Sequence, residues 1–421
     1  MAEIQGKGET MADIRPFCAI RPQASEADKI AALPYDVYNR KEAKEEVRRN
    51  PLSFLKIDRP ETQFPDDTDM YAPQVYRQAE ATLWKMLEDG HFCQDTESCY
   101  YIYELSSGEH TQTGLAACAA VDDYLNHVIK RHENTKPEKE EDRIRHVLAC
   151  QAQTGPIFLA HRPQERLKHI LDTKKKGSAP VYDFVSQDGI RHRVWIIYEE
   201  TIIEKIRQIY ADMDSIYIAD GHHRAACAVK AALRKRQETV HMTGKEPFNS
   251  FLCVLFPSDE LQILDYNRVV KDLNGCTPEE LLEKAEKYFT VQKAPGQVKP
   301  QEKGSFGLYV NGGWYRLRIR EACKNTDPVD GLDVSLLQNF LLDPVLGIKK
   351  PGEDKRITFV GGIRGLTELE RLADAFGGAA FSLYPTSMEE LMRTADAGRL
   401  MPPKSTWFEP KLRSGLFIHR I

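Results

Sequence analysis

The residues with the clearest chemical potential are the five from Asp220 to Arg224, which read Asp-Gly-His-His-Arg. The apolar stretch 215–219 before them predicts a strand, and the apolar spacing over 224–236 predicts a helix. A strand that passes into a helix at this point places these side chains at a helix N-terminus. There the backbone N–H groups point outward and the helix dipole favours negative charge. The pattern therefore predicts a phosphate-binding turn.

Each residue of this turn has its own role in that interpretation. Gly221 lets the backbone approach a phosphate closely. His222, His223 and Arg224 add hydrogen-bond donors, and an arginine can bind two phosphate oxygens at once. Asp220 is out of place among anion binders unless a cation is present, so we expect it to bind Mg²⁺. The alternative is an ordinary turn in which Asp220 caps the helix and the histidines are packed or solvated.

Phosphoryl transfer to a hydroxyl group also needs a carboxylate that accepts the hydroxyl proton. Glu133 lies in a polar loop just ahead of an expected helix, and Asp36 follows a Pro-containing turn. Glu133 could instead cap that helix, and Asp36 could form an Asx turn or bind a metal. We place Glu133 first as the base and Asp36 second, and His223 is a further catalytic candidate. Position 136 is Lys, so His132-Glu133 does not begin an H-E-x-x-H zinc motif.

A third informative segment is 401–411, which reads Met-Pro-Pro-Lys-Ser-Thr-Trp-Phe-Glu-Pro-Lys. Its three prolines fix the backbone, and its phosphate-compatible donors are Lys404, Ser405, Thr406 and Lys411. We expect Lys404, Ser405 and Thr406 to bind phosphate or substrate in the same cleft as His222 and Arg224. The alternative is that this segment is a purely structural loop that binds no ligand.

Composition limits the classes of protein that fit. The chain has 421 residues, a net charge of -5, 41% hydrophobic and 29% charged residues, which is typical of globular proteins. Its acidic balance gives no attraction to DNA, and no apolar run is long enough for a membrane helix. The nine cysteines are scattered without a C-x-x-C pair, which favours the reducing cytoplasm. We expect a small-molecule substrate, no DNA or membrane partner, and a possible homodimer.

Helical and strand patterns alternate along the chain, which predicts a mixed α/β fold. We expect a flexible N-terminal extension over residues 1–10 and a nucleotide-binding region over 11–294. A smaller C-terminal α/β subdomain is expected over 295–421 and would contribute a loop to the cleft. The boundary follows from Gln292–Gly304, which is rich in Lys, Gln, Pro and Gly.

The turn and its helix resemble the nucleotide-binding motif of the ParB and sulfiredoxin superfamily, in which Gly-x-x-Arg-x-x-Ala follows a strand and opens a helix. The Asp-Gly-His-x-Arg variant is similar to the free-serine kinases of that superfamily. Most of the chain resembles one group, the domain of unknown function 1015 family. The segments that carry this resemblance are Arg15-Pro-Phe17, Leu33–Val37, Asn50–Glu61, His132–Thr135, Asp220–Arg224, Tyr266–Val270 and Met401–Lys411.

This resemblance implies a ParB/sulfiredoxin-like nucleotide-binding core with large insertions, ATP or ADP with Mg²⁺ as cofactors, and a glutamate as the base. The chain departs from both named relatives. It has no helix-turn-helix or basic patch of the ParB type, and His222 stands where sulfiredoxins carry their catalytic cysteine. Cys227 lies five residues later and is expected to be a small core residue.

The leading hypothesis is a nucleotide-dependent phosphotransferase that acts on a small hydroxylated metabolite, with free L-serine as one candidate. A nucleotide-binding regulatory switch without catalysis uses the same turn. A metal-dependent phosphoester hydrolase uses the same residues as a kinase. The sequence leaves all three open.

Overall fold

The computed structural model describes residues 12–135 and 137–421. The expected N-terminal extension over 1–10 lies outside the described residues. The chain forms two compact units. The first contains residues up to 131 together with 135–261 and 410–421, and the second contains 132–134 and 262–409.

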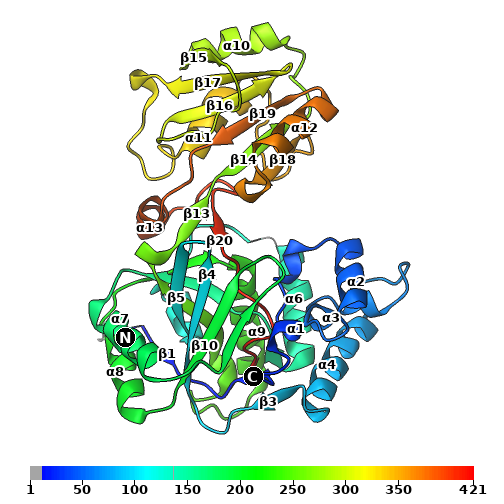
Figure 1. The fold of residues 1–421 in the computed structure, drawn as a ribbon, viewed down its shortest axis with the longest axis vertical. Helices are drawn as coiled ribbons and strands as arrows, with labels where there is room; N and C mark the ends of the chain where they lie inside the picture. The colour runs from blue at the N-terminus through cyan, green and yellow to red at the C-terminus, as the bar shows by residue number, and fades with distance from the viewer. Residues whose placement is uncertain (1–11, 136) are drawn as a thin grey trace, which may run out of the picture. The chain divides into compact units, whose positions relative to one another are not determined.

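The first unit is built on a mixed sheet, in which the described residues form nine strands. The order is β6-β11-β8-β12-β5-β4-β10-β9, and β1 pairs with β5. Figure 1 labels β1, β4, β5 and β10 of this sheet. The strands are β1 Ile14–Arg15, β4 Tyr100–Ser107, β5 His110–Ala120, β6 Ile129–Lys130, β8 Ile157–His161, β9 Tyr182–Val185, β10 Arg191–Ile197, β11 Ile216–Asp220 and β12 Ser250–Pro257. At its centre β8 runs parallel to β12 and antiparallel to β11.

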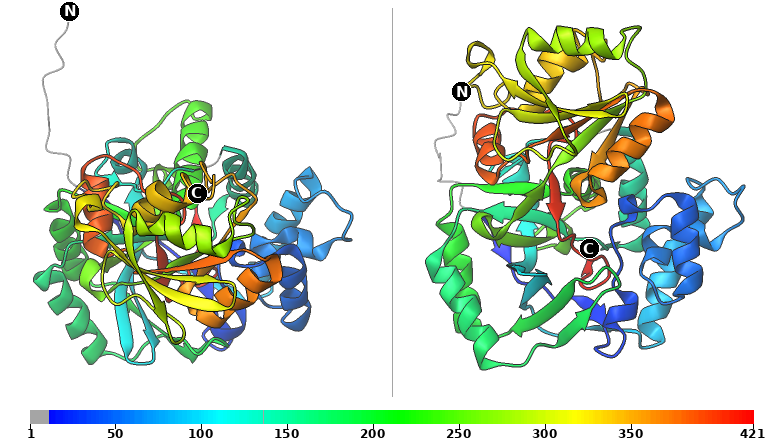
Figure 2. Two further views of the ribbon diagram at one scale, coloured as in Figure 1. Left: turned by 90° about the horizontal axis from the view of Figure 1, so that it is seen from above. Right: turned by 45° about the horizontal axis from the view of Figure 1, so that its top comes forward.

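Helices surround this sheet. They are α1 Ala27–Ile30, α2 Arg40–Arg49, α3 Leu55–Asp58, α4 Pro73–Glu88, α5 Val121–Leu125, α6 Pro137–Cys150, α7 Glu165–Gly177, α8 Glu200–Ala211 and α9 His222–Glu238. Helices α7 and α8 lie together on one side of the first unit, and α1 to α4 gather on the other (Figures 1 and 2). Helix α6 packs on α9 through Ile144, Cys227 and Ala231, which are all buried.

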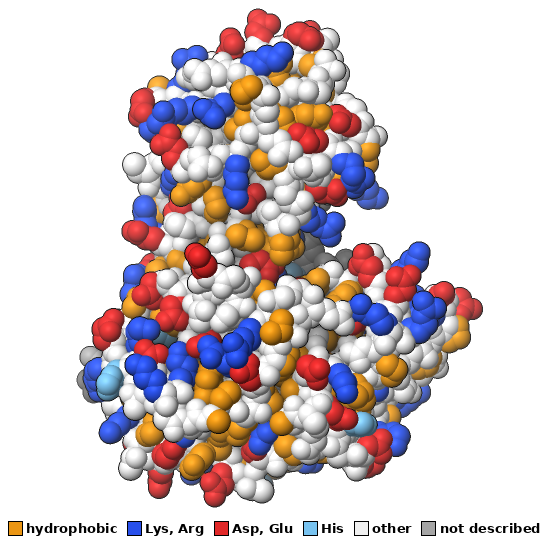
Figure 3. All heavy atoms as spheres, in the orientation of Figure 1, with side chains coloured by type: hydrophobic (Ala, Val, Ile, Leu, Met, Phe, Trp, Pro, Cys, Tyr) orange, Lys and Arg blue, Asp and Glu red, His pale blue; other side chains and the backbone are white. Residues whose placement is uncertain are grey.

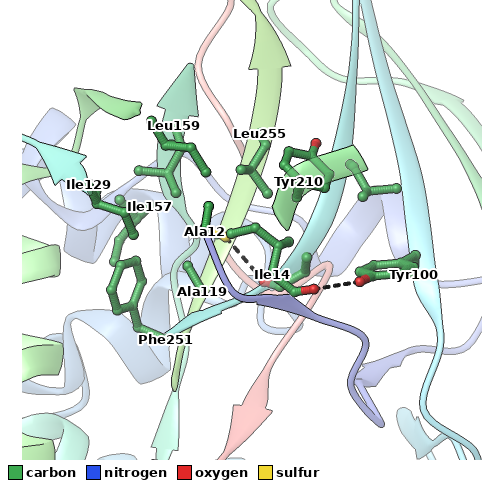
Figure 4. Close-up of a cluster of buried hydrophobic side chains, with 14 of the residues drawn as sticks. Ala12, Ile14, Tyr100, Ala119, Ile129, Ile157, Leu159, Tyr210, Phe251 and Leu255 are labelled. Carbon is green, nitrogen blue, oxygen red and sulfur yellow. Dashed lines mark hydrogen bonds between the residues drawn. The ribbon is translucent and has the colours of Figure 1, made fainter. Parts of the chain in front are cut away.

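The main core of the first unit joins the sheet to α7, α8 and α9. Figure 4 shows part of it, with Ile157, Leu159 and Leu255 from the central strands. The hydroxyl of Tyr100 donates a hydrogen bond to the carbonyl of Ile14 at 2.6 Å, so the only polar atom of this buried ring is paired.

The last twelve residues belong to the first unit because they return to its N-terminal part. The backbone of Ile418 exchanges two hydrogen bonds with Ile20, at 3.0 and 2.9 Å, and Ser414 pairs with Ala32. Two short pairs complete this part: β2 Ile20–Pro22 with β3 Phe92–Gln94, and β7 Ala152–Gln153 with β21 His419–Arg420. Residues from both ends of the chain therefore share one buried cluster.

The second unit contains an antiparallel sheet of six strands in its described residues, in the order β15-β17-β16-β19-β14-β18. These are β14 Tyr266–Val270, β15 Phe289–Ala294, β16 Ser305–Val310, β17 Gly313–Ile319, β18 Ile357–Gly361 and β19 Ala379–Leu383. The remaining pair is β13 Gln262–Leu264 with β20 Trp407–Glu409, and the helices are α10 Pro278–Glu286, α11 Asp333–Leu337, α12 Leu366–Phe376 and α13 Met388–Asp396.

The predicted mixed α/β class is confirmed. The expected boundary at 294/295, however, falls inside the sheet of the second unit, where Ala294 of β15 pairs with Trp314 of β17. The Pro- and Gly-rich segment after β15 is thus a loop between strands of one sheet. The C-terminal subdomain was also expected to reach residue 421, whereas 410–421 belong to the first unit.

Among the described residues, no helix combines the length and the apolar composition that crossing a membrane requires. On the face shown in Figure 3, Lys and Arg side chains are interspersed with Asp and Glu side chains.

Candidate active site

The predicted strand, turn and helix are present. Strand β11 ends at Asp220, Gly221 adopts a left-handed conformation with φ of 90°, and α9 begins at His222. A Cβ atom at Gly221 would lie 3.0 Å from Nε of Arg224, so glycine provides both this conformation and space for the guanidinium. The first turn of α9 therefore presents its backbone N–H groups beside Arg224.

A hydrogen bond fixes one edge of the Arg224 guanidinium. Its Nη1 donates a hydrogen bond to the carbonyl of Pro156 at 2.5 Å, just ahead of β8. Its side chain also passes close to Gly155, where an added Cβ would lie 3.7 Å from Cδ of Arg224. In the described part of the chain the other N–H groups of Arg224 have no hydrogen-bond partner. Arg224 is thus fixed in place and keeps donors for an anion.

Asp220 is engaged through both carboxylate oxygens. Oδ1 accepts a hydrogen bond from the backbone N–H of Gly221 at 2.7 Å, and Oδ2 accepts one from Nζ of Lys411 at 2.7 Å. Partial burial raises the pKa of Asp220, but the charges of Lys411 and Arg224 outweigh it and hold that pKa well below its ordinary value. The carboxylate is therefore ionised and paired with a lysine from the C-terminal segment.

A cavity of about 40 Å³ adjoins Arg224 within the first unit. It is lined by η1 (Tyr35–Val37), α3, α6, α9, the start of β8 and the C-terminal segment. The polar residues on its wall are Tyr35, Asp58, Arg143, His146, Gln153, Thr154, Arg224 and Ser414. Two arginines and one aspartate thus share a single pocket.

The second arginine of the cavity, Arg143, is only 9% exposed. Its guanidinium lies 4.4 Å from the ring centroid of Tyr35, its Nη1 donates to the carbonyl of Asp58 at 3.0 Å, and its Nε donates to Asp142 at 2.9 Å. Burial raises the pKa of the Tyr35 phenol, which stays protonated. These contacts fix a positive charge in the cavity wall.

Asp58 places a carboxylate opposite this charge. It is 3% exposed, and its Oδ1 accepts a hydrogen bond from Oγ1 of Thr154 at 2.7 Å. His146 beside it is neutral, because burial and the charge of Arg143 lower its pKa. Its Nε2 then donates to the carbonyl of Ile57 at 2.8 Å. A cavity with fixed cations and a fixed carboxylate suits a small molecule that carries both charges.

The predicted site residues fall into two groups by unit. Asp36, Asp220, Gly221, His222, His223 and Arg224 lie in the first unit. His222 is buried at the start of α9, and Asp36 is exposed in η1, next to Tyr35 of the cavity wall. Glu133, Lys404, Ser405 and Thr406 lie in the second unit, where Glu133 is half-buried.

Within the second unit, the segment 404–406 has the contacts of a closing loop. Oγ of Ser405 donates to the carbonyl of Pro402 at 2.6 Å, and its own carbonyl accepts from Oγ1 of Thr386 at 3.0 Å. The carbonyl of Lys404 accepts from Nη2 of Arg268 at 2.9 Å. These bonds stabilise the loop, and the phosphate-binding role of Lys404, Ser405 and Thr406 remains a prediction.

Sequence reasoning missed Asp58 and Arg143. Asp58 ends the short helix α3, which reads Leu-Lys-Ile-Asp, and the charged Lys56 and Arg59 around it leave no pattern that singles it out. Arg143 lies on a highly charged helix, where nothing distinguishes it from its neighbours. Cys227 was correctly expected in the core: it is buried, and burial raises the pKa of its thiol to about 12.

The described residues do not form a metal site by themselves. Among them, no group of three or more His, Cys, Asp or Glu side chains could hold a metal ion. Asp220, the predicted Mg²⁺ ligand, already binds Lys411 and the Gly221 N–H. Mg²⁺ at nucleotide sites commonly uses one or two carboxylates plus phosphate oxygens, so a nucleotide would have to bring most of its ligands.

A family model described as "Protein of unknown function (DUF1015)" matches residues 14–335, and the chain belongs to this family. No curated protein matches the chain. Similar solved structures include a free serine kinase in complex with AMP, at 16% identity and a TM-score of 0.37, with 72% of this chain and 91% of that chain covered.

Two further structures are similar at the same level. A conserved hypothetical protein from Pyrococcus furiosus has 15% identity and a TM-score of 0.34, covering 72% of this chain and 94% of that one. SbnI with a C-terminal truncation, from Staphylococcus aureus, has 10% identity and a TM-score of 0.36, covering 72% and 86%. Likenesses this low assign no activity to the present chain.

Proposed function

We propose that this member of the DUF1015 family is a phosphotransferase that uses ATP or ADP and acts on a small hydroxylated metabolite, with free L-serine as the first candidate. One observation carries the proposal. Arg224 is anchored on the carbonyl of Pro156 with donors left over, at the N-terminus of α9 and on the wall of a cavity that holds a second buried arginine.

The phosphate groups would bind at the start of α9. Backbone N–H groups at a helix N-terminus stabilise negative charge, and the left-handed Gly221 leaves the backbone open to close approach. Arg224 adds a fixed guanidinium, and Lys411 adds a second cation next to Asp220. His222 and His223 complete the predicted donors.

The acceptor would bind in the cavity beside Arg224. Arg143 offers a guanidinium to a carboxylate, and Asp58 offers an acceptor to an ammonium group. An amino acid carries both groups. In the transfer, its hydroxyl oxygen bonds to the terminal phosphorus, the bond from that phosphorus to the bridging oxygen breaks, and a carboxylate takes the hydroxyl proton.

Glu133 is our first choice for that carboxylate and Asp36 our second. This choice comes from the positions of the two residues in the sequence. Asp220 suits the role poorly, because Lys411 and the Gly221 N–H already bind both of its oxygens. Mg²⁺, when bound with the nucleotide, would neutralise phosphate charge.

The test is incubation of the full chain with ATP or ADP, Mg²⁺ and a panel of amino acids, followed by phosphorus NMR. We expect a new phosphomonoester signal with one hydroxyl amino acid and none with alanine. Phosphate release without an acceptor would favour the phosphoester hydrolase. Nucleotide binding without any turnover would favour the regulatory switch.

A further inference from the structure

The short helix η1 carries two residues that the proposed function uses, Tyr35 of the cavity wall and Asp36, the second choice of base. Its turn is closed by a backbone hydrogen bond from the N–H of Val37 to the carbonyl of Pro34 at 3.0 Å. A helix of one turn leaves its last carbonyl groups without partners inside the helix. The position of η1 therefore depends on bonds from other segments.

Arg59 supplies such bonds. Its Nη1 donates to the carbonyl of Tyr35 at 3.1 Å and to the carbonyl of Tyr38, directly after η1, at 2.7 Å. Its Nε donates to Oε1 of Glu61 at 2.6 Å. The side chains of Arg59 and Glu61 are only 11% and 3% exposed, so each charge neutralises a partner that water reaches poorly. One guanidinium thus joins η1 to a buried carboxylate.

The backbone that carries Arg59 is itself fixed. It follows α3, in which Leu55 and Ile57 are fully buried, and it precedes Pro60, which restricts the backbone of the residue before it. Oγ1 of Thr62 also donates to the carbonyl of Arg59 at 2.7 Å. A side chain anchored in this way can hold a neighbouring segment in a defined place.

Tyr35 is held through its ring as well. The guanidinium of Arg143 lies 4.4 Å from the ring centroid, and Nη1 of Arg143 donates to the carbonyl of Asp58 at 3.0 Å. Two adjacent residues of one segment therefore fix Tyr35, Asp58 through Arg143 and Arg59 through the backbone of η1. Without Arg59, only the contact of the ring with Arg143 would remain of these two.

We propose that Arg59 and Glu61 are positioning residues, which hold η1 so that Tyr35 and Asp36 keep their places beside the acceptor cavity. Neither is among the described residues that line this cavity, so both act through η1. The catalytic consequence rests on the proposed function, whereas the hold on η1 is measured without any turnover.

The hold on η1 is tested by fluorine NMR on the full chain labelled with 3-fluorotyrosine, in which Tyr35→Phe assigns the Tyr35 signal. The decisive variant is the double change Arg59→Met and Glu61→Met. It keeps side chains of similar size, leaves no buried charge unpaired and removes the donors to η1. We expect the Tyr35 signal to shift or broaden in this double variant. An unchanged Tyr35 signal would overturn the proposal.

The matched control is Asp95→Asn. Asp95 forms a part-buried ion pair with Arg21 at 2.8 Å, and its side chain also accepts a hydrogen bond from the hydroxyl of Tyr101. None of these residues belongs to η1, so the Tyr35 signal should be unchanged in Asp95→Asn. A Tyr35 shift as large as in the double variant would overturn the proposal, because general loosening of the fold would then explain both results.

Kinetics test the consequence for catalysis. In the double variant, kcat/KM for the hydroxyl acceptor should fall about 10²-fold, the effect of a displacement of about 1 Å. KM for the nucleotide should be unchanged, because Arg224 and Lys411 hold the phosphate turn through other contacts. Equal losses for acceptor and nucleotide would contradict positioning through η1. If the wild-type chain phosphorylates no acceptor, the proposed function fails, and the Tyr35 signal still decides whether Arg59 and Glu61 hold η1.

Discussion

The two ends of β8 carry cavities of similar size and opposite charge. Ile157, at the start of the strand, lines the cavity of about 40 Å³ whose wall holds Arg143 and Arg224. His161, at its end, lines the cavity of about 30 Å³ whose wall holds four carboxylates and one lysine. Strand β8 lines both cavities, and the neighbouring segments supply the charged side chains of each wall.

The physical origin of this difference is local. The cationic cavity receives its arginines from α6 and α9, and the acidic cavity receives its carboxylates from α7 and the residues after β12. Anions are therefore favoured at one edge of the sheet and cations at the other. The first predictions below concern the chemistry at the cationic edge.

The largest expected effect is on turnover. Glu133→Gln keeps the shape of the side chain but removes the basic oxygen, so turnover should fall by about 10²–10⁴-fold, with nucleotide affinity little changed. Steady-state kinetics and nucleotide titration on the same protein separate the two quantities. If Glu133→Gln retains full activity and Asp36→Asn loses it, the base is Asp36.

The next effect concerns the cationic cavity itself. Arg224→Ala should weaken ATP or ADP binding by about 1–3 kcal/mol, because it removes charge-assisted hydrogen bonds to phosphate. The matched control is Arg234→Ala on the same helix, which breaks only an ion pair to Glu141. Calorimetry should find nearly wild-type nucleotide affinity in the control. Equal losses of nucleotide affinity in both variants would show that Arg224 contributes only its positive charge and makes no specific contact with phosphate.

A smaller effect is expected on stability. The pKa of Asp220 is depressed, so its ionisation stabilises the fold above the unfolded pKa, near 4, and this stability is lost as the pH falls through the folded pKa. Lys411→Met should lower the free energy of unfolding at pH 7 by about 1–3 kcal/mol. Urea unfolding from pH 7 to pH 3 should show the difference from wild type shrinking below about pH 4. A difference independent of pH would assign the loss to packing.

The smallest effect is expected with DNA. The net charge of -5 gives no net electrostatic attraction to a duplex. At about 150 mM salt, binding should stay at the non-specific level, roughly 10⁻⁴ M or weaker. A sequence-specific nanomolar gel shift would contradict this.

The sequence predicted the turn well because the turn is a local feature. Asp220-Gly221 between an apolar strand and a periodic helix determines the backbone over a few residues, and the structure has this arrangement from β11 to α9. The domain boundary was harder. The composition of Gln292–Gly304 resembles a linker, yet the strands on either side of it belong to one sheet.

The contacts that complete the site were not predictable, because they join residues far apart in the chain. Lys411 reaches Asp220 across 191 positions, and Arg224 reaches Pro156 across 68. In the segment 401–411 it is Lys411 that binds Asp220 within the first unit, whereas the residues expected to bind phosphate were Lys404, Ser405 and Thr406. Contacts over such separations follow from the packing of the whole chain and leave no local pattern in the sequence.

The most direct test of the central claim is a crystal structure of the full chain with ADP and Mg²⁺. We predict that the terminal phosphate lies within hydrogen-bond distance of the backbone N–H groups at the start of α9 and of the Arg224 guanidinium. A well-ordered nucleotide bound elsewhere, with the first turn of α9 unoccupied, would contradict the account.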